Sequence, residues 1–216
     1  DCYVVGGFVR DGLMGHANSD IDIAVAGDAI AIASDIAKAL EAKLVPLNEA
    51  NQIARVIPPQ DKGPWHLDFA TLRGNIEEDL KLRDFNINAI AIRLAGAKGN
   101  WSQVEVIDPL DGCRDLSRRV IRPVSDAAFQ QDPVRLLRAF RLAATLDFAL
   151  DPITEPLIQR DSRLISSVAS ERLRDELGYI LETNKAYHSF CYLDKVGLLE
   201  YLMPELTKAK GVTQPK

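Results

Sequence analysis

Cysteine and histidine are scarce in this sequence of 216 residues, with three of each. Cys2, Cys113 and Cys191 lie far apart, and neither their number nor their spacing is that of a disulfide framework or a zinc site. The histidines are equally scattered, so each is expected to have a structural or surface role rather than to bind a metal. This cysteine usage fits a reducing, cytoplasmic compartment best.

A long hydrophobic run and an excess of positive charge are also missing. No apolar stretch approaches the roughly 18 residues needed to cross a bilayer, so no membrane segment is expected. The net charge is −5, so any grip on RNA must come from local arginine clusters or from further segments. The length suits one large domain or two small ones. The strand-like opening without Met and the linker-like end lead us to expect a piece of a longer protein.

Strand and helix patterns alternate over residues 1–125 and give way to helical patterns over residues 126–216. The expected strands are 2–5, 21–25, 43–47, 52–57 and 65–72, with residues 86–93 suited to a strand or a helix. The expected helices are 8–14, 28–42, 76–83, 126–147, 153–165, 170–183 and 185–203. The sequence therefore predicts an α+β protein, with a small mixed sheet and flanking helices followed by an all-helical domain.

Two acids lie two positions apart in the second expected strand. Asp20 and Asp22 should share one face, about 6.5–7 Å apart, where a pair of metal ions would relieve their repulsion. Upstream, Gly6-Gly7 at a strand-to-helix turn lets backbone amides approach a triphosphate, and Arg10 can reach a phosphate oxygen. A solvated acid pair or an ordinary glycine turn would explain either half alone. Their combination favours a nucleotide site.

Three more polar residues carry a signal in the first region. Asp68 lies on the expected strand 65–72, where taken by itself it is explained as an acid at a sheet edge. Arg83 and Asp84 directly precede a buried run that begins at Phe85. A surface ion pair worth about 0–1 kcal/mol is the alternative for this pair. The buried run favours a fixed position and hence a role in a site.

A ribbon of arginines follows Asp132 in the second region. With Asp132 at 0° on a helix of about 100° per residue, Arg135, Arg138 and Arg141 fall at roughly 300°, 240° and 180°. The arginines wind away from the apolar face, as a cationic stripe that can follow a nucleotide. A solvated charged face is one alternative. The other is that Asp132 only caps a helix that starts at Pro133.

Six motifs in this order resemble those of one family. They are Gly-Gly-x-Val-Arg-Asp at 6–11 with Asp-x-Asp at 20–22, the acidic strand at 66–73, Arg-Asp-Phe-Asn-Ile-Asn-Ala at 83–89, Asp-x3-Gly at 108–112 with Arg122, Gln-Asp-x-x-Arg at 131–135, and Glu-Arg at 171–172. Together they resemble the head and neck of the class II tRNA nucleotidyltransferases (CCA-adding enzymes) and bacterial poly(A) polymerases. Leu82 and Gln131 depart from the family pattern, in which Arg and Glu are usual.

The resemblance implies a DNA polymerase beta-like head at 1–125 and a neck at 126–216, with the nucleotide between them. It implies that Asp20 and Asp22 bind two Mg²⁺ ions and that Asp68 assists the metals or deprotonates the RNA 3′-hydroxyl. The triphosphate, ribose and base contacts implied by the resemblance are Gly6, Gly7, Arg10, Arg83, Asp84, Asp132, Arg135, Arg138 and Arg141. Among these, Asp132 and Arg135 would read the Watson–Crick edge of the base.

The implied reaction is template-independent transfer of AMP or CMP from ATP or CTP to the 3′ end of tRNA. The product could be CCA, CC, a single A or a poly(A) tail, and residues 28–72 resemble A-adding or poly(A)-forming relatives more closely. A non-catalytic nucleotide-binding module and an enzyme that modifies a small molecule are the alternatives. The arginine helix at 132–141 argues against the small-molecule enzyme.

Overall fold

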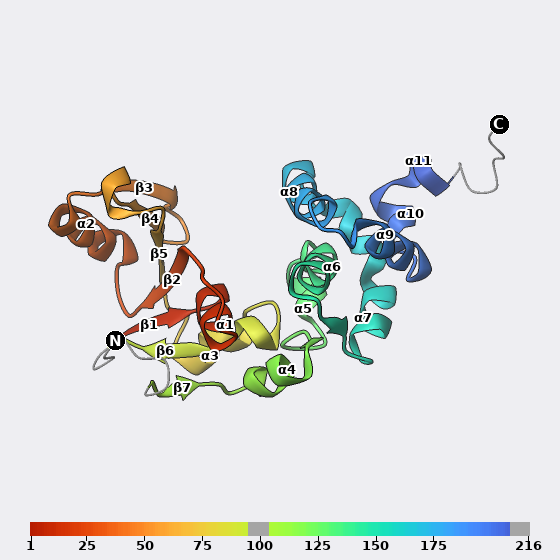
Figure 1. The fold of residues 1–216 in the computed structure, drawn as a ribbon, viewed down its shortest axis with the longest axis horizontal. Coiled ribbons are helices and arrows are strands. Elements are labelled where there is room, and N and C mark those ends of the chain that lie inside the picture. Colours follow the sequence, from red (N-terminus) through yellow and green to blue (C-terminus); the bar gives the residue numbers. More distant parts are fainter. Residues whose placement is uncertain (95–103, 208–216) are drawn as a thin grey trace. The chain divides into compact units, whose positions relative to one another are not determined.

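The computed structural model describes residues 1–94 and 104–207, which fold into two compact units (Figure 1). The first unit ends at Ser117 and the second begins at Arg118. The boundary expected from the sequence, between residues 125 and 126, falls inside the second unit.

A mixed sheet forms the centre of the first unit. Within residues 1–94 and 104–117, seven strands pair in the order β3-β4-β5-β2-β1-β6-β7. They are β1 (Cys2–Val5), β2 (Asp20–Val25), β3 (Lys43–Asn48), β4 (Ile53–Ile57), β5 (His66–Thr71), β6 (Ala91–Arg93) and β7 (Val106–Ile107). Strands β2 and β5 run parallel, and the other neighbours run antiparallel. All five strands expected from the sequence are present, and the ambiguous run at 86–93 is a short 3₁₀ turn, η2 (Asn86–Asn88), followed by β6.

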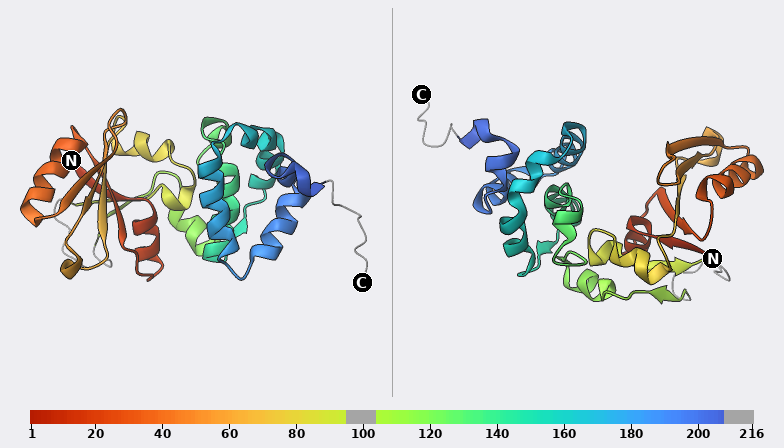
Figure 2. Two further views of the ribbon diagram at one scale, coloured as in Figure 1. Left: turned by 90° about the horizontal axis from the view of Figure 1, so that it is seen from above. Right: turned by 180° about the vertical axis from the view of Figure 1, so that it is seen from behind.

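Helix α2 (Ala29–Leu40) covers one face of this sheet (Figure 2). It begins at Asp28, whose carboxylate accepts a hydrogen bond from the Ala31 amide at 2.9 Å. The helix packs through small side chains, which lets its backbone come close to the strands. The buried residues of this layer include Ala29, Ala33, Ala37, Ile23, Val25 and Phe69. Because side chains alternate along a strand, Asp22, Ala24, Asp68 and Ala70 lie on the opposite face, which we call the carboxylate face.

Three helices and two 3₁₀ turns complete the first unit. They are α1 (Gly7–Leu13), η1 (Gln60–Lys62), α3 (Ile76–Lys81), η2 and α4 (Gly112–Arg118). The start of α4 is closely fitted. The Asp108 carboxylate accepts from the amides of Gly112 and Cys113 at 2.7 and 2.8 Å. A Cβ at Gly112 would lie 2.2 Å from the carbonyl oxygen of Asn86, so only glycine fits there.

Helices make up most of the second unit. They are α5 (Ala128–Gln131), α6 (Arg135–Leu146), α7 (Thr154–Asp161), η4 (Ser162–Ser167), α8 (Ser170–Leu181), α9 (Ala186–Lys195), α10 (Leu198–Leu202) and α11 (Pro204–Thr207). The predicted α+β class is confirmed, but the second unit is not purely helical. Strand β9 (Ala149–Leu150) pairs in parallel with β8 (Val120–Ile121). Each strand has two residues, too few for any periodicity to predict.

Two of the expected helices are broken. The helix expected at 126–147 is interrupted because Asp132 is extended ahead of Pro133, a residue that disfavours helical geometry in its predecessor. The helix expected at 185–203 is divided at Gly197, which has a left-handed backbone with φ 79°. In the described part of the chain, no helix is long and apolar enough to cross a bilayer.

Candidate active site

Strand register brings two of the predicted acids together on the carboxylate face. Asp22 on β2 is paired with Asp68 on β5, and on its other side with Val5 on β1. Residues that are paired across neighbouring strands point to the same face. The sheet therefore places Asp68 beside Asp22, although the two are far apart in the sequence.

The pKa of Asp22 is raised to about 6. Burial is the largest cause, the charge of Arg83 opposes it, and the charges of Asp68 and Asp20 act in the same direction as burial. A buried carboxylate among like charges is poorly stabilised as an anion, so a cation bound at this cluster would stabilise its charged form.

Asp68 is held by an arginine that the sequence analysis did not single out. Arg55 on β4 is paired with Asp68 in register, and its Nε and Nη2 donate to the two carboxylate oxygens at 2.7 and 2.6 Å. Such a two-point contact fixes both position and orientation of the carboxylate. The signal for Arg55 was a single charge inside the otherwise apolar strand 53–57.

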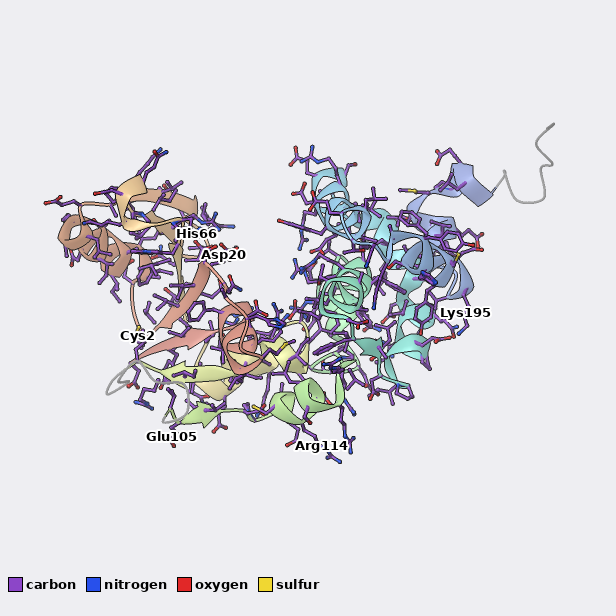
Figure 3. All side chains as sticks on the ribbon, viewed as in Figure 1. Cys2, Asp20, His66, Glu105, Arg114 and Lys195 are labelled. Atoms are coloured by element: carbon purple, nitrogen blue, oxygen red, sulfur yellow. The ribbon has the colours of Figure 1, made fainter. Side chains whose placement is uncertain are left out.

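Asp20 lies at the start of β2, where its side chain is 65% exposed. His66 Nε2 is 3.0 Å from Asp20 Oδ1 but makes no hydrogen bond within the described residues. Figure 3 shows where the two side chains lie in the first unit. His66 is paired with Asp20 across β2 and β5, as Asp68 is paired with Asp22. The carboxylate face thus ends in an acid that solvent reaches.

The Gly6-Gly7 turn touches this cluster directly. Gly6 has φ 74°, and a Cβ there would lie 2.8 Å from Asp22 Oδ2 and 3.2 Å from Arg83 Nη1. A side chain at this position would displace the carboxylate or the guanidinium, so glycine is required on both counts. Gly7 is the first residue of α1. The Gly6 amide donates to the Ile90 carbonyl at 3.4 Å, which holds the turn in place beside Asp22 and Arg83.

Arg10, the expected phosphate contact, is held within a local network. Its guanidinium donates to the Asp11 carboxylate at 2.7 and 2.9 Å and to Asn88 Oδ1 at 2.7 Å. Its side chain is 11% exposed. Asn88 also donates to Asp84 Oδ1 at 3.1 Å, and the same oxygen accepts from the Phe85 amide. Asp84 thus has a clear structural role at the start of η2.

In the second unit, Asp132 is paired with a neck arginine. Its carboxylate accepts from Arg172 Nη1 and Nη2 at 3.0 and 2.8 Å. Burial alone would raise the pKa of Asp132, but the hydrogen bonds and charge of Arg172, with the charge of Arg135, hold it below the usual value. Arg172 on α8 holds both oxygens of this carboxylate and so fixes its orientation. It keeps Asp132 ionised.

The arginine ribbon on α6 is fixed by an acid that the sequence analysis did not single out. Glu176 on α8 is buried and accepts from Arg138 Nε at 2.7 Å and Arg141 Nε at 2.5 Å. Arg141 also lies over the Tyr179 ring, 5.6 Å from its centroid. Arg135 donates to the carbonyl of Ala128 at 3.3 Å. Arg138 and Arg141 are thus positioned by α8, and Arg135 by α5, rather than simply solvated.

Comparison with known proteins identifies the family. A family model described as the poly A polymerase head domain matches residues 2–122. The chain belongs to the poly A polymerase head-domain family. A second model, described as a probable RNA and SrmB-binding site of polymerase A, matches residues 147–210.

Three named relatives align with between 83% and 99% of the chain. It is 38% identical over 216 residues to the A-adding tRNA nucleotidyltransferase of Deinococcus radiodurans, covering 98% of this chain and 47% of that protein. It is 40% identical over 181 residues to the CC-adding enzyme of Geobacter sulfurreducens, covering 83% and 40%. The Thermotoga maritima CCA-adding enzyme complexed with tRNA superposes with a TM-score of 0.83 at 36% identity, over 99% of this chain and 50% of that one. The chain thus spans about half the length of these relatives.

Nucleotidyltransferases of the poly A polymerase head-domain family generally use divalent metal ions. Within residues 1–94 and 104–207, no three His, Cys, Asp or Glu side chains converge as a ready-made metal site. The donor set of Asp20 and Asp22 nevertheless fits a hard divalent cation, because it consists of carboxylate oxygens. The raised pKa of Asp22 agrees with this fit, since a cation would stabilise its anionic form.

Proposed function

We propose that this protein is an RNA nucleotidyltransferase that transfers AMP, CMP or both from ATP and CTP to the 3′ end of tRNA. One observation supports this most: Asp22 and Asp68 are paired across β2 and β5, with the Gly6 turn against Asp22. The relatives named as A-adding, CC-adding and CCA-adding enzymes point to the same reaction. An arrangement of this kind brings a triphosphate and an acceptor hydroxyl to one cluster of acids.

The first unit would bind the triphosphate and orient the hydroxyl. Two Mg²⁺ ions held by Asp20 and Asp22 would supply the charge that stabilises the attacking and leaving oxygens. The Gly6-Gly7 turn would let the triphosphate approach the backbone closely, and the Arg83 guanidinium beside Gly6 can donate to a phosphate or ribose oxygen. Asp68, oriented by its two hydrogen bonds, would receive or polarise the proton of the RNA 3′-hydroxyl.

The second unit would read the base. An ionised Asp132 accepts a hydrogen bond from the exocyclic amino group of cytosine or adenine, and Arg135 donates to a ring nitrogen or carbonyl. Guanine and uracil present mismatched groups and would leave polar atoms unpaired. Arg172 supports this role because it keeps Asp132 charged. Arg138 and Arg141, fixed by Glu176, would add positive charge for the nucleotide or the RNA.

The relatives include A-adding, CC-adding and CCA-adding enzymes, and the incorporation test below distinguishes these products from one another and from a poly(A) tail. We place the enzyme in the cytoplasm, because all three cysteines are unpaired thiols and two of them are exposed.

Incorporation into RNA tests the proposal. Full-length protein is incubated with Mg²⁺ and tRNA transcripts lacking CCA, CA or A, with labelled CTP and ATP supplied separately. Transfer to the 3′ end is expected, and Asp22→Ala should abolish it. Asp35→Ala serves as the control, since Asp35 is an exposed acid on α2 paired only with Lys38. Binding of nucleotide without transfer would instead indicate a non-catalytic module, and Asp22→Ala activity within about tenfold of wild type would reject the mechanism.

A further inference from the structure

A cavity of about 550 Å³ lies on the carboxylate face, next to the proposed active site. Its floor is formed by Ala24 and Ala70, which are paired across β2 and β5. Each alanine follows one of the paired acids, Asp22 and Asp68, by two positions. The floor of the cavity is therefore about 6.5–7 Å from those acids along the strands. The methyl side chains leave the space that larger residues would fill.

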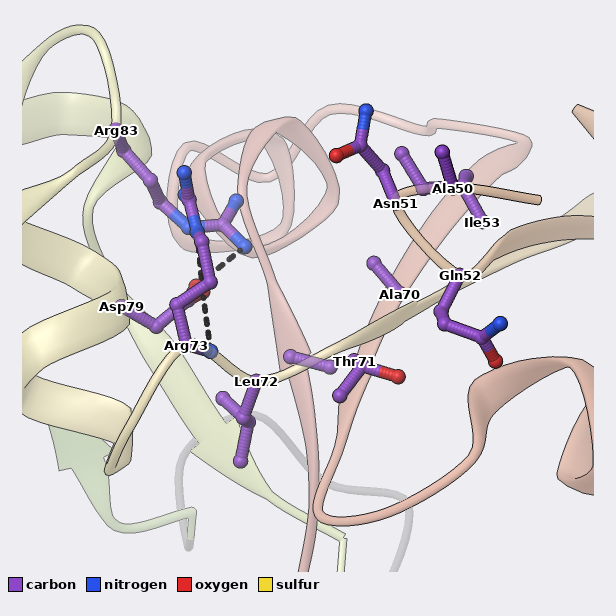
Figure 4. Close-up of a pocket in the computed structure, with 11 residues that line it drawn as sticks. Ala50, Asn51, Gln52, Ile53, Ala70, Thr71, Leu72, Arg73, Asp79 and Arg83 are labelled. Atoms are coloured by element: carbon purple, nitrogen blue, oxygen red, sulfur yellow. Dashed lines mark hydrogen bonds and ion pairs between the residues drawn. The ribbon is translucent and has the colours of Figure 1, made fainter. Parts of the chain in front are cut away.

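One wall of the cavity is cationic and rigid. Asp79 on α3, with a side chain 6% exposed, accepts from Arg73 Nε at 3.3 Å and from Arg83 Nη2 at 3.2 Å (Figure 4). Two guanidinium groups share this single carboxylate, so the wall keeps a net charge of about +1. Arg73 remains 59% exposed, and it can donate to a ligand without breaking its contact. A wall of this kind suits a phosphate.

Arg83 supplies a second indication of a ligand. Its Nε is buried and makes no hydrogen bond within the described residues. A buried donor left without an acceptor is destabilising, because it has lost its hydrogen bonds to water without replacing them. The same guanidinium borders the cavity and lies beside Gly6. An oxygen-rich ligand in this region would satisfy the donor and connect the cavity with the triphosphate turn.

The opposite rim of the cavity is a short polar turn. Asn51 and Gln52 lie between β3 and β4, and Figure 4 shows Asn51 across the cavity from Arg73 and Arg83. Gln52 has φ 52°, a left-handed conformation that is uncommon for this residue type, and its amide donates to the Glu49 carbonyl at 3.1 Å. The turn is thus held in one shape, with the Asn51 amide able to donate to and accept from a base edge.

We propose that this cavity binds the 3′-terminal nucleotide of the RNA acceptor, with Arg73 on its phosphate and Asn51 at its base. The inference rests on the function proposed above. The triphosphate turn at Gly6 is on the β1 side of Asp22, whereas the cavity extends to the β5 and β4 side. If the RNA 3′-hydroxyl lies at Asp68, the base and phosphate of the same nucleotide lie within about 7 Å of it, which is the distance between every second residue of a strand. The cavity is the space available at that distance.

The test separates the affinity for RNA from the affinity for the nucleoside triphosphate. Full-length Arg73→Ala and Ala70→Val are assayed for steady-state KM and kcat on the tRNA transcript that the wild type extends, and on a short oligoribonucleotide with the same 3′ end. Both variants should raise KM for each RNA at least about tenfold. Arg73→Ala removes one charge-assisted hydrogen bond, and Ala70→Val fills the space above the cavity floor. KM for ATP or CTP should stay within about twofold. Arg93→Ala is the matched control, since Arg93 on β6 is 48% exposed, is paired with Asp1 and is not among the residues that line the cavity.

Three results would overturn the assignment. An increase in KM for the triphosphate instead of the RNA would give the cavity to the incoming nucleotide. Kinetics equal to those of Arg93→Ala on both RNAs would show that the cavity binds neither substrate. An effect of Arg73→Ala on the long transcript but not on the oligoribonucleotide would place its contact away from the RNA 3′ end. If the wild type itself adds no nucleotide to any transcript, the proposed function fails before the cavity is tested.

Discussion

Glu176→Ala should destabilise the second unit by about 2–4 kcal/mol. Glu176 is 7% exposed and is the common acceptor of Arg138 and Arg141, at 2.7 and 2.5 Å. Removing one partner of a buried ion pair costs about 3–5 kcal/mol, because the remaining charge is left uncompensated. The two arginine side chains are 29% and 23% exposed, so water can solvate them in part, and we reduce the value accordingly.

Urea unfolding followed by far-UV circular dichroism measures this effect. With a urea dependence of about 1–3 kcal/mol per molar, the midpoint should fall by roughly 1 M or more. Glu176→Gln keeps the shape and one acceptor oxygen, so it should lose less. Glu171→Ala is the matched control, since Glu171 is an exposed glutamate on the same helix, and its change should stay within about 0.5 kcal/mol.

Equal midpoints for Glu176→Ala and Glu171→Ala would refute this reasoning. The arginine ribbon would then be positioned by its own packing on α6, and Glu176 would contribute nothing that solvent does not replace. A double-mutant cycle with Arg138→Met isolates the pairwise contribution. A coupling energy near zero would lead to the same conclusion.

Three further predictions concern the acids and the glycine fit. In EDTA, Asp22→Asn should be more stable than wild type at pH 7 by up to about 3 kcal/mol, because burial and neighbouring acids raise the pKa of Asp22 from 3.8 to about 6; urea unfolding at pH 4 and 7 measures the difference. The sign follows from a folded pKa above the ordinary value, so the contribution of Asp22 to wild-type stability is fully present below about pH 4 and is lost as pH rises through 6. Gly112→Ala should lower the thermal midpoint, because its Cβ would meet the Asn86 carbonyl oxygen at 2.2 Å; calorimetry measures the shift, with a cost of roughly 1–3 kcal/mol. Arg172→Met should raise the pKa of Asp132, since burial would then act with less opposition; carboxyl NMR titration follows it.

Each of these predictions has a control and a result that contradicts it. Asp35→Asn should leave the pH dependence unchanged, and an Asp22→Asn curve parallel to wild type would contradict the charge argument. Gly178→Ala places a methyl group where nothing lies within 4 Å, so it should stabilise α8 by about 0.5–1 kcal/mol. An equally stable Gly112→Ala would remove the steric argument. For Asp132, an unchanged titration after Arg172→Met would mean that other groups keep it ionised.

Local signals in the sequence predicted most of the elements. Alternation and turn residues placed the five strands of 2–5 through 65–72, and the 3.6-residue period placed α2 and α8, because these patterns depend on neighbours along the chain. Gly197 and Pro133 are helix-breaking residues in the sequence, yet the longer periodic pattern around each of them led us to predict unbroken helices. The structure shows a left-handed Gly197 and an extended Asp132 before Pro133. The two-residue strands β8 and β9 carry no periodicity and form only by pairing with each other.

The candidate site divides in the same way. The sequence determined which residue types and spacings occur: the Gly-Gly turn, Asp20 and Asp22 on one strand, and Asp132 before the arginine ribbon. Only the tertiary structure decided which partners these groups have. Strand register set Asp68 beside Asp22 and Arg55 on Asp68, helix packing set Glu176 between two arginines, and the fold placed Asp79 between Arg73 and Arg83. Spacing along a chain fixes a face of one element, whereas pairing between elements depends on how the whole sheet and core pack.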